Sequence, residues 1–234
     1  MEVITNGLVD KFQFFTPSSV LISGASGQGK TKLVTSVIQH ASDLFEVNPD
    51  GIIVCYKIWQ PLYDEMRTYR PDIIFIRDLP KKTLLIKFLQ SKKHTLLILD
   101  DMMNEACNSS FMSDVFCQYG HHFNCSIIVL TQNLTLTGKY KSDIVKNTQT
   151  YILMNNPCEA FQIRCLATKL NDFRALMGAY QLATLWPRGY LLVDLNPKTD
   201  QVLRYRTHIF PGERCVIYVG SNQRNVLELR NVSA

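Results

Sequence analysis

Long apolar runs are missing from this sequence of 234 residues. The longest, such as Ile52–Tyr56 and Leu96–Leu99, are far shorter than the roughly 20 residues that a membrane-spanning helix needs. The first ten residues combine no basic segment with an apolar one, so they lack the pattern of a signal peptide. We find neither an internal repeat nor a low-complexity segment. The sequence therefore predicts a soluble intracellular protein that does not bind a membrane.

A disulfide framework is also missing. The seven cysteines, an odd number, are scattered through strand-like and helix-like segments, which fits a reducing compartment. Cys117, His121, His122 and Cys125 include zinc-ligand types, but their spacing matches no common zinc motif. We therefore expect no zinc site here, and we expect Cys125 to pack as a small apolar side chain.

The excess of positive charge is small over the whole chain, at +5, but it is unevenly distributed. Up to residue 138 there are 12 Lys and Arg against 13 Asp and Glu, and from residue 139 onward there are 13 against 7. A basic C-terminal part is suited to a polyanion such as a nucleic acid, although a solvated surface explains it nearly as well.

Short apolar segments rich in β-branched residues alternate with amphipathic segments. The apolar segments predict buried strands of a parallel sheet at Val20–Ser23, Ile52–Tyr56, Ile73–Ile76, Leu96–Leu99 and Ser126–Leu130. The amphipathic segments predict helices at Thr31–Leu44, Gln60–Tyr69, Lys81–Ser91 and Phe111–Tyr119. This alternation predicts a three-layer α/β fold with right-handed crossovers around a mostly parallel central sheet.

The pattern changes in the C-terminal part of the chain. It predicts a strand at Thr150–Met154 and one or two helices within Cys158–Leu185. Two further strands, Tyr190–Leu195 and Val202–Thr207, are predicted to flank a turn at Asn196–Asp200. From Gly212 onward the chain has one short apolar stretch, Val216–Val219, and we expect this tail to be loosely attached. The predicted organisation is one domain over residues 1–211, with its core at about 16–195, and a small C-terminal extension over 212–234.

A glycine-rich loop follows the first predicted strand and precedes the first predicted helix, and it matches the G-x-x-x-x-G-K-[ST] pattern. Its glycines let backbone N–H groups surround a phosphate, and the start of the helix favours negative charge. The lysine would reach the β- and γ-phosphates, and the threonine hydroxyl would bind Mg²⁺. The alternative is an ordinary glycine-rich turn. The predicted nucleotide-binding residues are Gly24, Ala25, Ser26, Gly27, Gln28, Gly29, Lys30, Thr31 and Lys32.

Two carboxylates end the apolar strand at Leu96–Leu99. Carboxylates at the end of a buried strand are costly unless they are paired or bind a metal. We expect Asp100 to hold the Mg²⁺ and Asp101 to polarise the attacking water, which favours hydrolysis. The alternative role for Asp101 is a helix N-cap.

The spacing between the loop and the two carboxylates favours a particular class of nucleotide hydrolase. Two strand-like segments lie between them, and such an added strand is typical of water-activating ATPases, by analogy of fold. The sequence has no N-K-x-D guanine motif, so ATP is favoured over GTP.

The predicted strand at Ser126–Leu130 is followed by polar residues. Gln132 could contact the γ-phosphate there and respond to its loss, while the alternative is that Thr131–Asn133 forms an ordinary polar turn. The aromatic residues Tyr56, Trp59 and Tyr63 are expected to pack together rather than to stack on bases.

Six segments carry a family resemblance, namely GASGQGKT, IIVCYKIWQPLYDEM, LLILDD, YGHHFNCSIIVLTQN, YLLVDLNPKTD and RYRTHIFP. Together they resemble the genome-packaging ATPases of the poxvirus type, which belong to the FtsK–HerA superfamily of ring-forming DNA pumps. Relatives occur in large DNA viruses, in virophages and in virus-like self-synthesising transposons. The resemblance covers about residues 16 to 211, and the tyrosine–tryptophan run and the His-His block make it more specific than the glycine-rich loop alone.

The resemblance implies a P-loop NTPase of the additional-strand, RecA- or FtsK-like type that forms a ring, usually of six subunits. Such a ring threads double-stranded DNA of any sequence into a preformed capsid, so a capsid or portal-vertex protein is an implied partner. Lys30 and Thr31 fall on the Walker A pair, Asp100 and Asp101 on the Walker B pair, and Gln132 on the sensor. The implied place of action is the host cytoplasm or nucleus where virus assembles, or the virion itself.

The sequence departs from its relatives where an arginine that acts on the neighbouring subunit is expected. Lys141 and Ser142 follow Gly138-Lys139 in place of an arginine, and the usual Asn-Pro-Arg-Asp reads Asn156-Pro157-Cys158-Glu159. The candidates that remain are Arg164, Arg174, Arg204 and Arg206, and we assign the role to none of them.

Three functions are compatible with this sequence. The first is an ATP-driven translocase that packages viral double-stranded DNA, with ATP and Mg²⁺ as cofactors. The second is a HerA- or FtsK-like helicase or DNA segregation pump. The third is a nucleotide-gated capsid-assembly module without motor activity, which the presence of Asp101 argues against.

Overall fold

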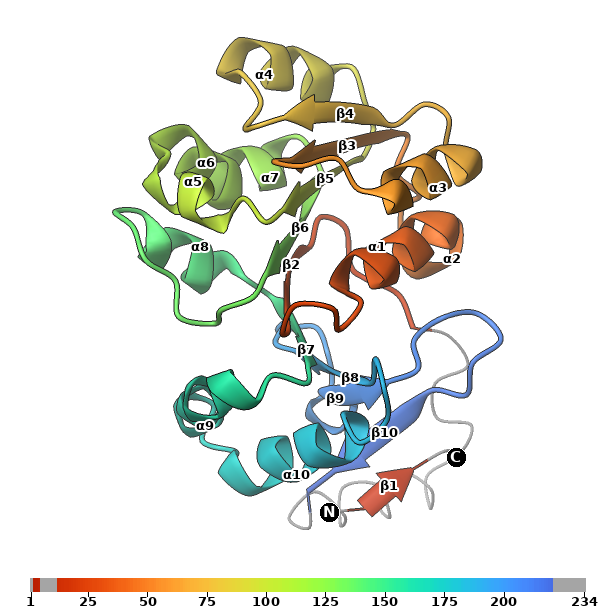
Figure 1. Cartoon of the computed structure of the whole chain (residues 1–234), viewed down its shortest axis with the longest axis vertical. Helices are drawn as coiled ribbons and strands as arrows, with labels where there is room; N and C mark the ends of the chain where they lie inside the picture. Colours follow the sequence, from red (N-terminus) through yellow and green to blue (C-terminus); the bar gives the residue numbers. More distant parts are fainter. Residues whose placement is uncertain (1, 5–11, 221–234) are drawn as a thin grey trace.

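The computed structural model describes residues 2–4 and 12–220. In this part of the chain one sheet contains the strands β1 (Glu2–Ile4), β2 (Ser19–Ser23), β3 (Gly51–Tyr56), β4 (Ile74–Arg77), β5 (Thr95–Asp100), β6 (Cys125–Thr131), β7 (Thr150–Met154), β8 (Tyr190–Asp194), β9 (Tyr205–Thr207) and β10 (Val216–Val219). Their order is β1-β10-β9-β8-β7-β2-β6-β5-β3-β4 (Figure 1). The six strands from β7 to β4 run parallel, and the others pair antiparallel. This is the mostly parallel sheet that the sequence predicts.

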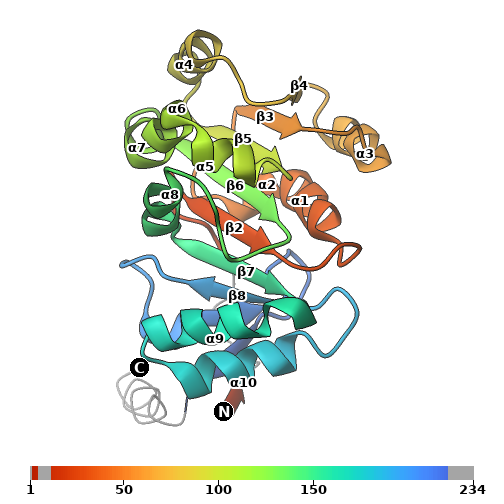
Figure 2. The same ribbon diagram turned by 60° about the vertical axis from the view of Figure 1, so that its left-hand side comes forward.

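Helices cover both faces of the sheet. They are α1 (Lys30–Gln39), α2 (Ala41–Leu44), α3 (Pro61–Tyr69), α4 (Lys82–Gln90), α5 (Met103–Asn108), α6 (Ser110–Asp114), α7 (Gly120–His122), α8 (Lys141–Asn147), α9 (Ala160–Lys169) and α10 (Phe173–Ala183). The helices α1 to α3 lie on one face, and α5 to α8 lie on the other (Figures 1 and 2). Both views place α9 and α10 side by side at the antiparallel end of the sheet. In the described residues no helix is both long and apolar enough to cross a membrane.

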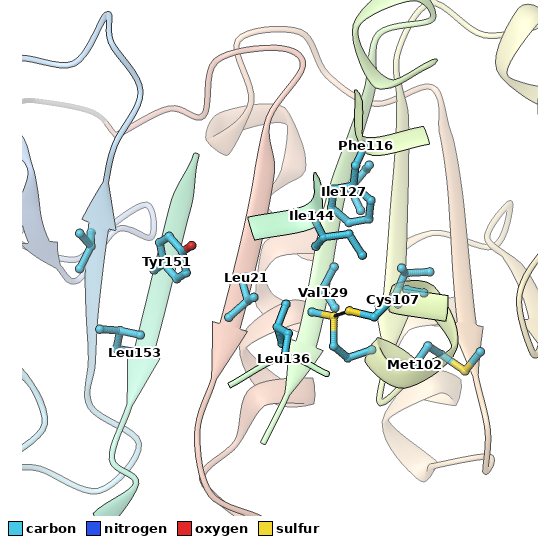
Figure 3. Close-up of a cluster of buried hydrophobic side chains, with 14 of the residues drawn as sticks. Leu21, Met102, Cys107, Phe116, Ile127, Val129, Leu136, Ile144, Tyr151 and Leu153 are labelled. Atoms are coloured by element: carbon cyan, nitrogen blue, oxygen red, sulfur yellow. Dashed lines mark hydrogen bonds between the residues drawn. The ribbon is translucent and has the colours of Figure 1, made fainter. Parts of the chain in front are cut away.

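The alternation of side chains along each central strand builds two separate cores. In β2, Leu21 packs on the side of α5 to α10, whereas Val20 and Ile22 pack against α1. Figure 3 shows the first of these cores, in which Leu21 and Val129 of neighbouring strands meet Ile144 of α8. Burial on both faces explains why the parallel strands are continuous apolar runs in the sequence.

Several predicted elements differ from the structure. The helix predicted at Thr31–Leu44 is interrupted at His40, where it divides into α1 and α2. The helix predicted at Phe111–Tyr119 is α6 followed by a π-helical turn over Val115–Tyr119. The prediction that the strand at Ile73–Ile76 is buried was wrong, because β4 is half-exposed and, within residues 2–4 and 12–220, lies at the edge of the sheet beside β3.

The C-terminal strands also differ from the prediction. In the stretch predicted as a strand at Val202–Thr207, residues 201–203 form a 3₁₀ turn, because the Asp200 carboxylate accepts a hydrogen bond from Val202 N. Val216–Val219 is not loosely attached, since it forms β10 and pairs with both β9 and β1. The sheet therefore continues beyond residue 211. The predicted division into a domain and a C-terminal tail stays a prediction, and residues 221–234 of that tail lie outside the described part of the chain.

A buried ion pair joins β8 to β9. The guanidinium of Arg206 donates a hydrogen bond to Asp194 Oδ2, and both side chains are almost fully buried. Arg206 therefore faces the interior of the fold, which removes it from the candidates for an arginine that acts on a neighbouring chain.

Replacing Asp194 by alanine is expected to lower the free energy of unfolding by about 3–5 kcal/mol, because the Arg206 charge would remain buried without its partner. Urea denaturation measures this loss. The double variant Asp194→Leu with Arg206→Met is the control, and it should be much less destabilised than Asp194→Ala. A loss below about 1 kcal/mol in the single variant, typical of an exposed pair, would contradict this account.

Candidate nucleotide-binding site

The glycine-rich loop connects β2 to α1 at the carboxyl edge of the parallel strands. Gly27 and Gly29 have φ angles of 78° and 95°, in the left-handed region that glycine adopts without strain. Gly24 N donates to Thr131 O of β6 at 3.3 Å, which fixes the start of the loop beside that strand. The helix begins directly at Lys30, so the free N–H groups of its first turn point toward the loop. This arrangement suits the binding of phosphate.

Lys30 lies across the loop that precedes it. Its Nζ atom donates to Gly24 O at 2.7 Å and to Ala25 O at 3.0 Å. Burial lowers the pKa of Lys30, while the negative charges of Asp100 and Asp101 act in the opposite direction. The ammonium group is therefore held at the loop by backbone carbonyls, close to both carboxylates.

Asp100 is the last residue of β5, and its carboxylate is nearly buried. The atom Oδ2 accepts hydrogen bonds from Thr31 Oγ1 at 3.2 Å and from Tyr63 OH at 2.8 Å. Burial raises the pKa of Asp100, whereas the hydrogen bonds from Tyr63 and Thr31 lower it. The structure thus brings together the threonine and the first aspartate that the sequence predicts for one site.

Sequence reasoning missed the role of α3 in this cluster. Tyr63 packs against Tyr56 and Trp59 as expected, with ring centroids 5.4 and 5.3 Å apart, but its hydroxyl also reaches Asp100. Gln60 Nε2 lies 3.5 Å from the same carboxylate oxygen. The signal is present in the polar atoms of the Trp-Gln-Pro-Leu-Tyr run, to which we assign no contact with the carboxylates from the sequence.

The oxygen atoms at this point fit Mg²⁺. The Thr31 hydroxyl and the Asp100 carboxylate are hard ligands 3.2 Å apart. Mg²⁺ usually takes one or two protein oxygens and completes its octahedron with phosphates and water. Among the described residues no group of three or more His, Cys, Asp and Glu could hold a metal ion. The pair therefore fits a metal that is bound together with phosphates.

Asp101 has a different environment from Asp100. It is exposed, and its φ angle of 57° places it in the left-handed region. The N-cap of α5 is Met102, without a side-chain hydrogen bond, so Asp101 does not cap that helix. The carboxylate instead lines the cleft together with Lys30. The structure therefore does not support the helix N-cap alternative for Asp101. It leaves the carboxylate accessible to water in the cleft.

Gln132 follows β6 and also lines the cleft. The buried Asn156 fixes the backbone of Gln132, because Asn156 Nδ2 donates a hydrogen bond to Gln132 O at 2.9 Å. Two residues further, Leu134 N donates to the buried Glu159 carboxylate at 2.9 Å. The segment Asn156–Glu159 thus anchors the loop that carries Gln132.

These residues surround one cleft of about 510 Å³. Its walls are formed by Ser26, Gly27, Gly29, Lys30, Thr31, Lys32, Gln60, Leu62, Asp100, Asp101, Leu130, Gln132 and Arg188. Gly24, Ala25 and Gln28 belong to the same loop but are not among the lining residues. Arg188 is absent from every sequence prediction above, because nothing in its local sequence indicates a role.

Comparison with known proteins identifies a family and a number of solved structures that this chain resembles. The model of the NB-ARC domain matches residues 1–169 of this chain. No curated protein gives a significant match.

The genome packaging NTPase B204 of Sulfolobus turreted icosahedral virus 2, in complex with sulfate, is 14% identical, with a TM-score of 0.55 over 78% of this chain and 94% of that one. Its complex with ATP-gammaS gives 16% identity and a TM-score of 0.51 over the same shares. The DNA-packaging ATPase B204 from Sulfolobus turreted icosahedral virus gives 15% identity and a TM-score of 0.54, over 78% and 95% of the two chains. At these identities the likeness establishes the shared α/β fold.

Proposed function

This chain belongs to the NB-ARC domain family, and from that premise we propose that it binds ATP and Mg²⁺ in the cleft and hydrolyses the bond between the β- and γ-phosphates of ATP. The observation that carries the proposal is the Thr31–Asp100 hydrogen bond. It joins the first turn of α1 to the end of β5, at the edge of the sheet that the phosphate-binding loop occupies. Ligands of open α/β sheets bind at this edge.

The chemistry proposed is an in-line attack of water on the γ-phosphorus. Asp101 takes a proton from the water while the water oxygen forms a bond to the γ-phosphorus. The bond between the γ-phosphorus and the β–γ bridging oxygen breaks, which yields ADP and inorganic phosphate. Lys30 leaves the carbonyls of the loop and donates to the phosphate oxygens, where charge develops. Thr31 and Asp100 would hold Mg²⁺, which supplies further neutralisation of that charge. Gln132, which follows β6 next to the end of β5, orients the water or the γ-phosphate.

We further propose that ATP hydrolysis drives double-stranded DNA into a viral capsid. Three observations support this proposal: the motif resemblance to poxvirus-type packaging ATPases, the fold shared with the genome packaging NTPase B204, and the basic C-terminal part. The proposed working form is a homo-oligomeric ring of six subunits, as the motif resemblance implies, that docks on a capsid or portal-vertex protein at the site of virus assembly. DNA contacts would be made by Lys and Arg to phosphates, independent of sequence.

Phosphate release by the purified protein should rise several-fold when double-stranded DNA is added. The stimulation should fall steeply between 50 and 200 mM salt, since protein contacts to DNA phosphates release counterions. The comparison at both salt concentrations without DNA is the control for effects on the ATPase itself. Turnover that is indifferent to DNA would contradict the translocase and favour the capsid-assembly module, and strand displacement without a capsid would favour a helicase.

A further inference from the structure

Arg188 lies in the loop between α10 and β8 and forms part of the wall of the nucleotide cleft. Its aliphatic part covers the glycine-rich loop: a methyl group on Gly29 would lie 3.5 Å from both Cγ and Cδ of Arg188. The arginine and the loop are about 160 residues apart in the chain. Tertiary structure therefore places a guanidinium group next to the residue that precedes Lys30.

The backbone of this loop is held in an uncommon conformation. Arg188 has a φ angle of 62°, in the left-handed region that non-glycine residues seldom adopt. The following residue, Gly189, donates from its N–H to Trp186 O at 2.9 Å. A Cβ atom on Gly189 would approach Ala183 O to 2.3 Å, so only glycine fits there. These contacts fix the direction in which the Arg188 side chain leaves the loop, and uncommon backbone conformations that surroundings hold in place often occur at ligand sites.

The guanidinium of Arg188 is the charged group that this loop adds to the cleft wall. Across the described residues its guanidinium has no hydrogen bond and no ion pair. The side chain is exposed and lines the cleft wall. Other arginines are engaged: Arg70 pairs with Asp72, and Arg206 pairs with Asp194. A planar guanidinium can donate two parallel hydrogen bonds to one phosphate group. An unpaired guanidinium beside this glycine-rich loop is therefore suited to bind phosphate.

We propose that Arg188 binds the polyphosphate of the nucleotide from within the same chain, opposite the N–H groups of the glycine-rich loop. The inference rests on the proposed binding of ATP in this cleft and names a residue that no motif assigns. Arg188 closes the phosphate site on the side of Gly29 and adds a second positive charge there to that of Lys30. The site thus contains an arginine of its own, in a chain that lacks the arginines expected after Gly138-Lys139 and after Pro157.

The experiment measures dissociation constants of ATP and of inorganic tripolyphosphate for the full chain and three variants. Arg188→Ala removes the guanidinium, and Arg188→Gly removes it while suiting the left-handed backbone, so at least one variant should keep the fold. Arg77→Ala is the matched control, because Arg77 is exposed at the edge strand β4 and does not line the cleft. Thermal melting of each variant reports whether the fold is retained.

We expect both Arg188 variants to weaken ATP and tripolyphosphate by about tenfold or more, as for the loss of a charged hydrogen bond, and Arg77→Ala to change neither. Unchanged ATP affinity in the folded Arg188 variants would overturn the inference and leave the proposed ATPase intact. Weakened ATP with unchanged tripolyphosphate would also overturn it, because the arginine would then contact the base. If the unaltered protein binds neither ligand, the proposed function fails first and the inference fails with it.

Discussion

Replacing Lys30 by alanine is expected to reduce ATP turnover by at least about 10²–10³-fold, close to complete loss in a steady-state assay. The variant removes the ammonium that would donate to the β- and γ-phosphates, and no other lysine of the cleft wall can replace it. Lys32, which also lines the cleft, is turned outward into an ion pair with Glu65 at 2.6 Å. Phosphate release and ATP affinity, measured side by side, test this expectation.

A second variant separates the lost charge from a disturbed loop. In the present structure Lys30 also holds the carbonyl groups of Gly24 and Ala25. Lys30→Gln keeps a hydrogen-bond donor near them without the positive charge, so it should be folded and nevertheless inactive. Lys87→Ala, an exposed lysine of α4, removes one charge far from the cleft wall and should retain turnover. Normal turnover in folded Lys30→Ala would contradict the assignment of the phosphate site.

The phosphate-binding loop could be predicted from the sequence because its conformation is determined locally. Gly27 and Gly29 supply the two left-handed positions, and the strand before them and the helix after them each have a clear apolar period. The same is true of β7, whose bounds at Thr150–Met154 match the predicted strand. In these segments local preference and tertiary packing favour the same structure.

Other parts of the site depend on contacts between distant residues, and these could not be predicted. Tyr63 and Asp100 are 37 residues apart, and only the pairing of β3 with β5 brings the first turn of α3 close to the end of β5. Arg188 depends on the turn that Gly189 permits. The edge position of β4 is likewise a property of the sheet order and not of its apolar sequence. Such pairings have no signal in a single sequence beyond the residue types themselves.

The two adjacent carboxylates illustrate how one strand end produces two chemical environments. Asp100 completes the buried alternation of β5 and points toward Thr31 and Tyr63. Asp101 follows with a positive φ angle, which turns the chain away from the sheet and leaves its carboxylate exposed. The first group is thus hydrogen-bonded and suited to a metal, and the second has access to water. This separation is the physical basis for assigning them different roles.

Replacing Asp101 by asparagine should lower the rate of ATP hydrolysis by about 10²–10⁴-fold while leaving ATP affinity nearly unchanged. The amide cannot accept the proton of the attacking water, but it has the size of the carboxylate. Asparagine is also among the residues that most readily adopt the left-handed conformation found at position 101, so the backbone should be retained. Single-turnover phosphate release, with a separate measurement of ATP binding, checks both parts of this expectation.

The choice of asparagine makes the result specific to chemistry. Asp101→Ala would combine the loss of the carboxylate with strain at a φ angle of 57°, so a slow rate in that variant could reflect a displaced β5–α5 connection. If Asp101→Asn is slow and Asp101→Gly, which suits the same φ angle, is equally slow, the carboxylate itself is responsible for the rate. Full turnover in Asp101→Asn would move the base elsewhere, and Gln132, which also lines the cleft, would then be the residue that positions the water.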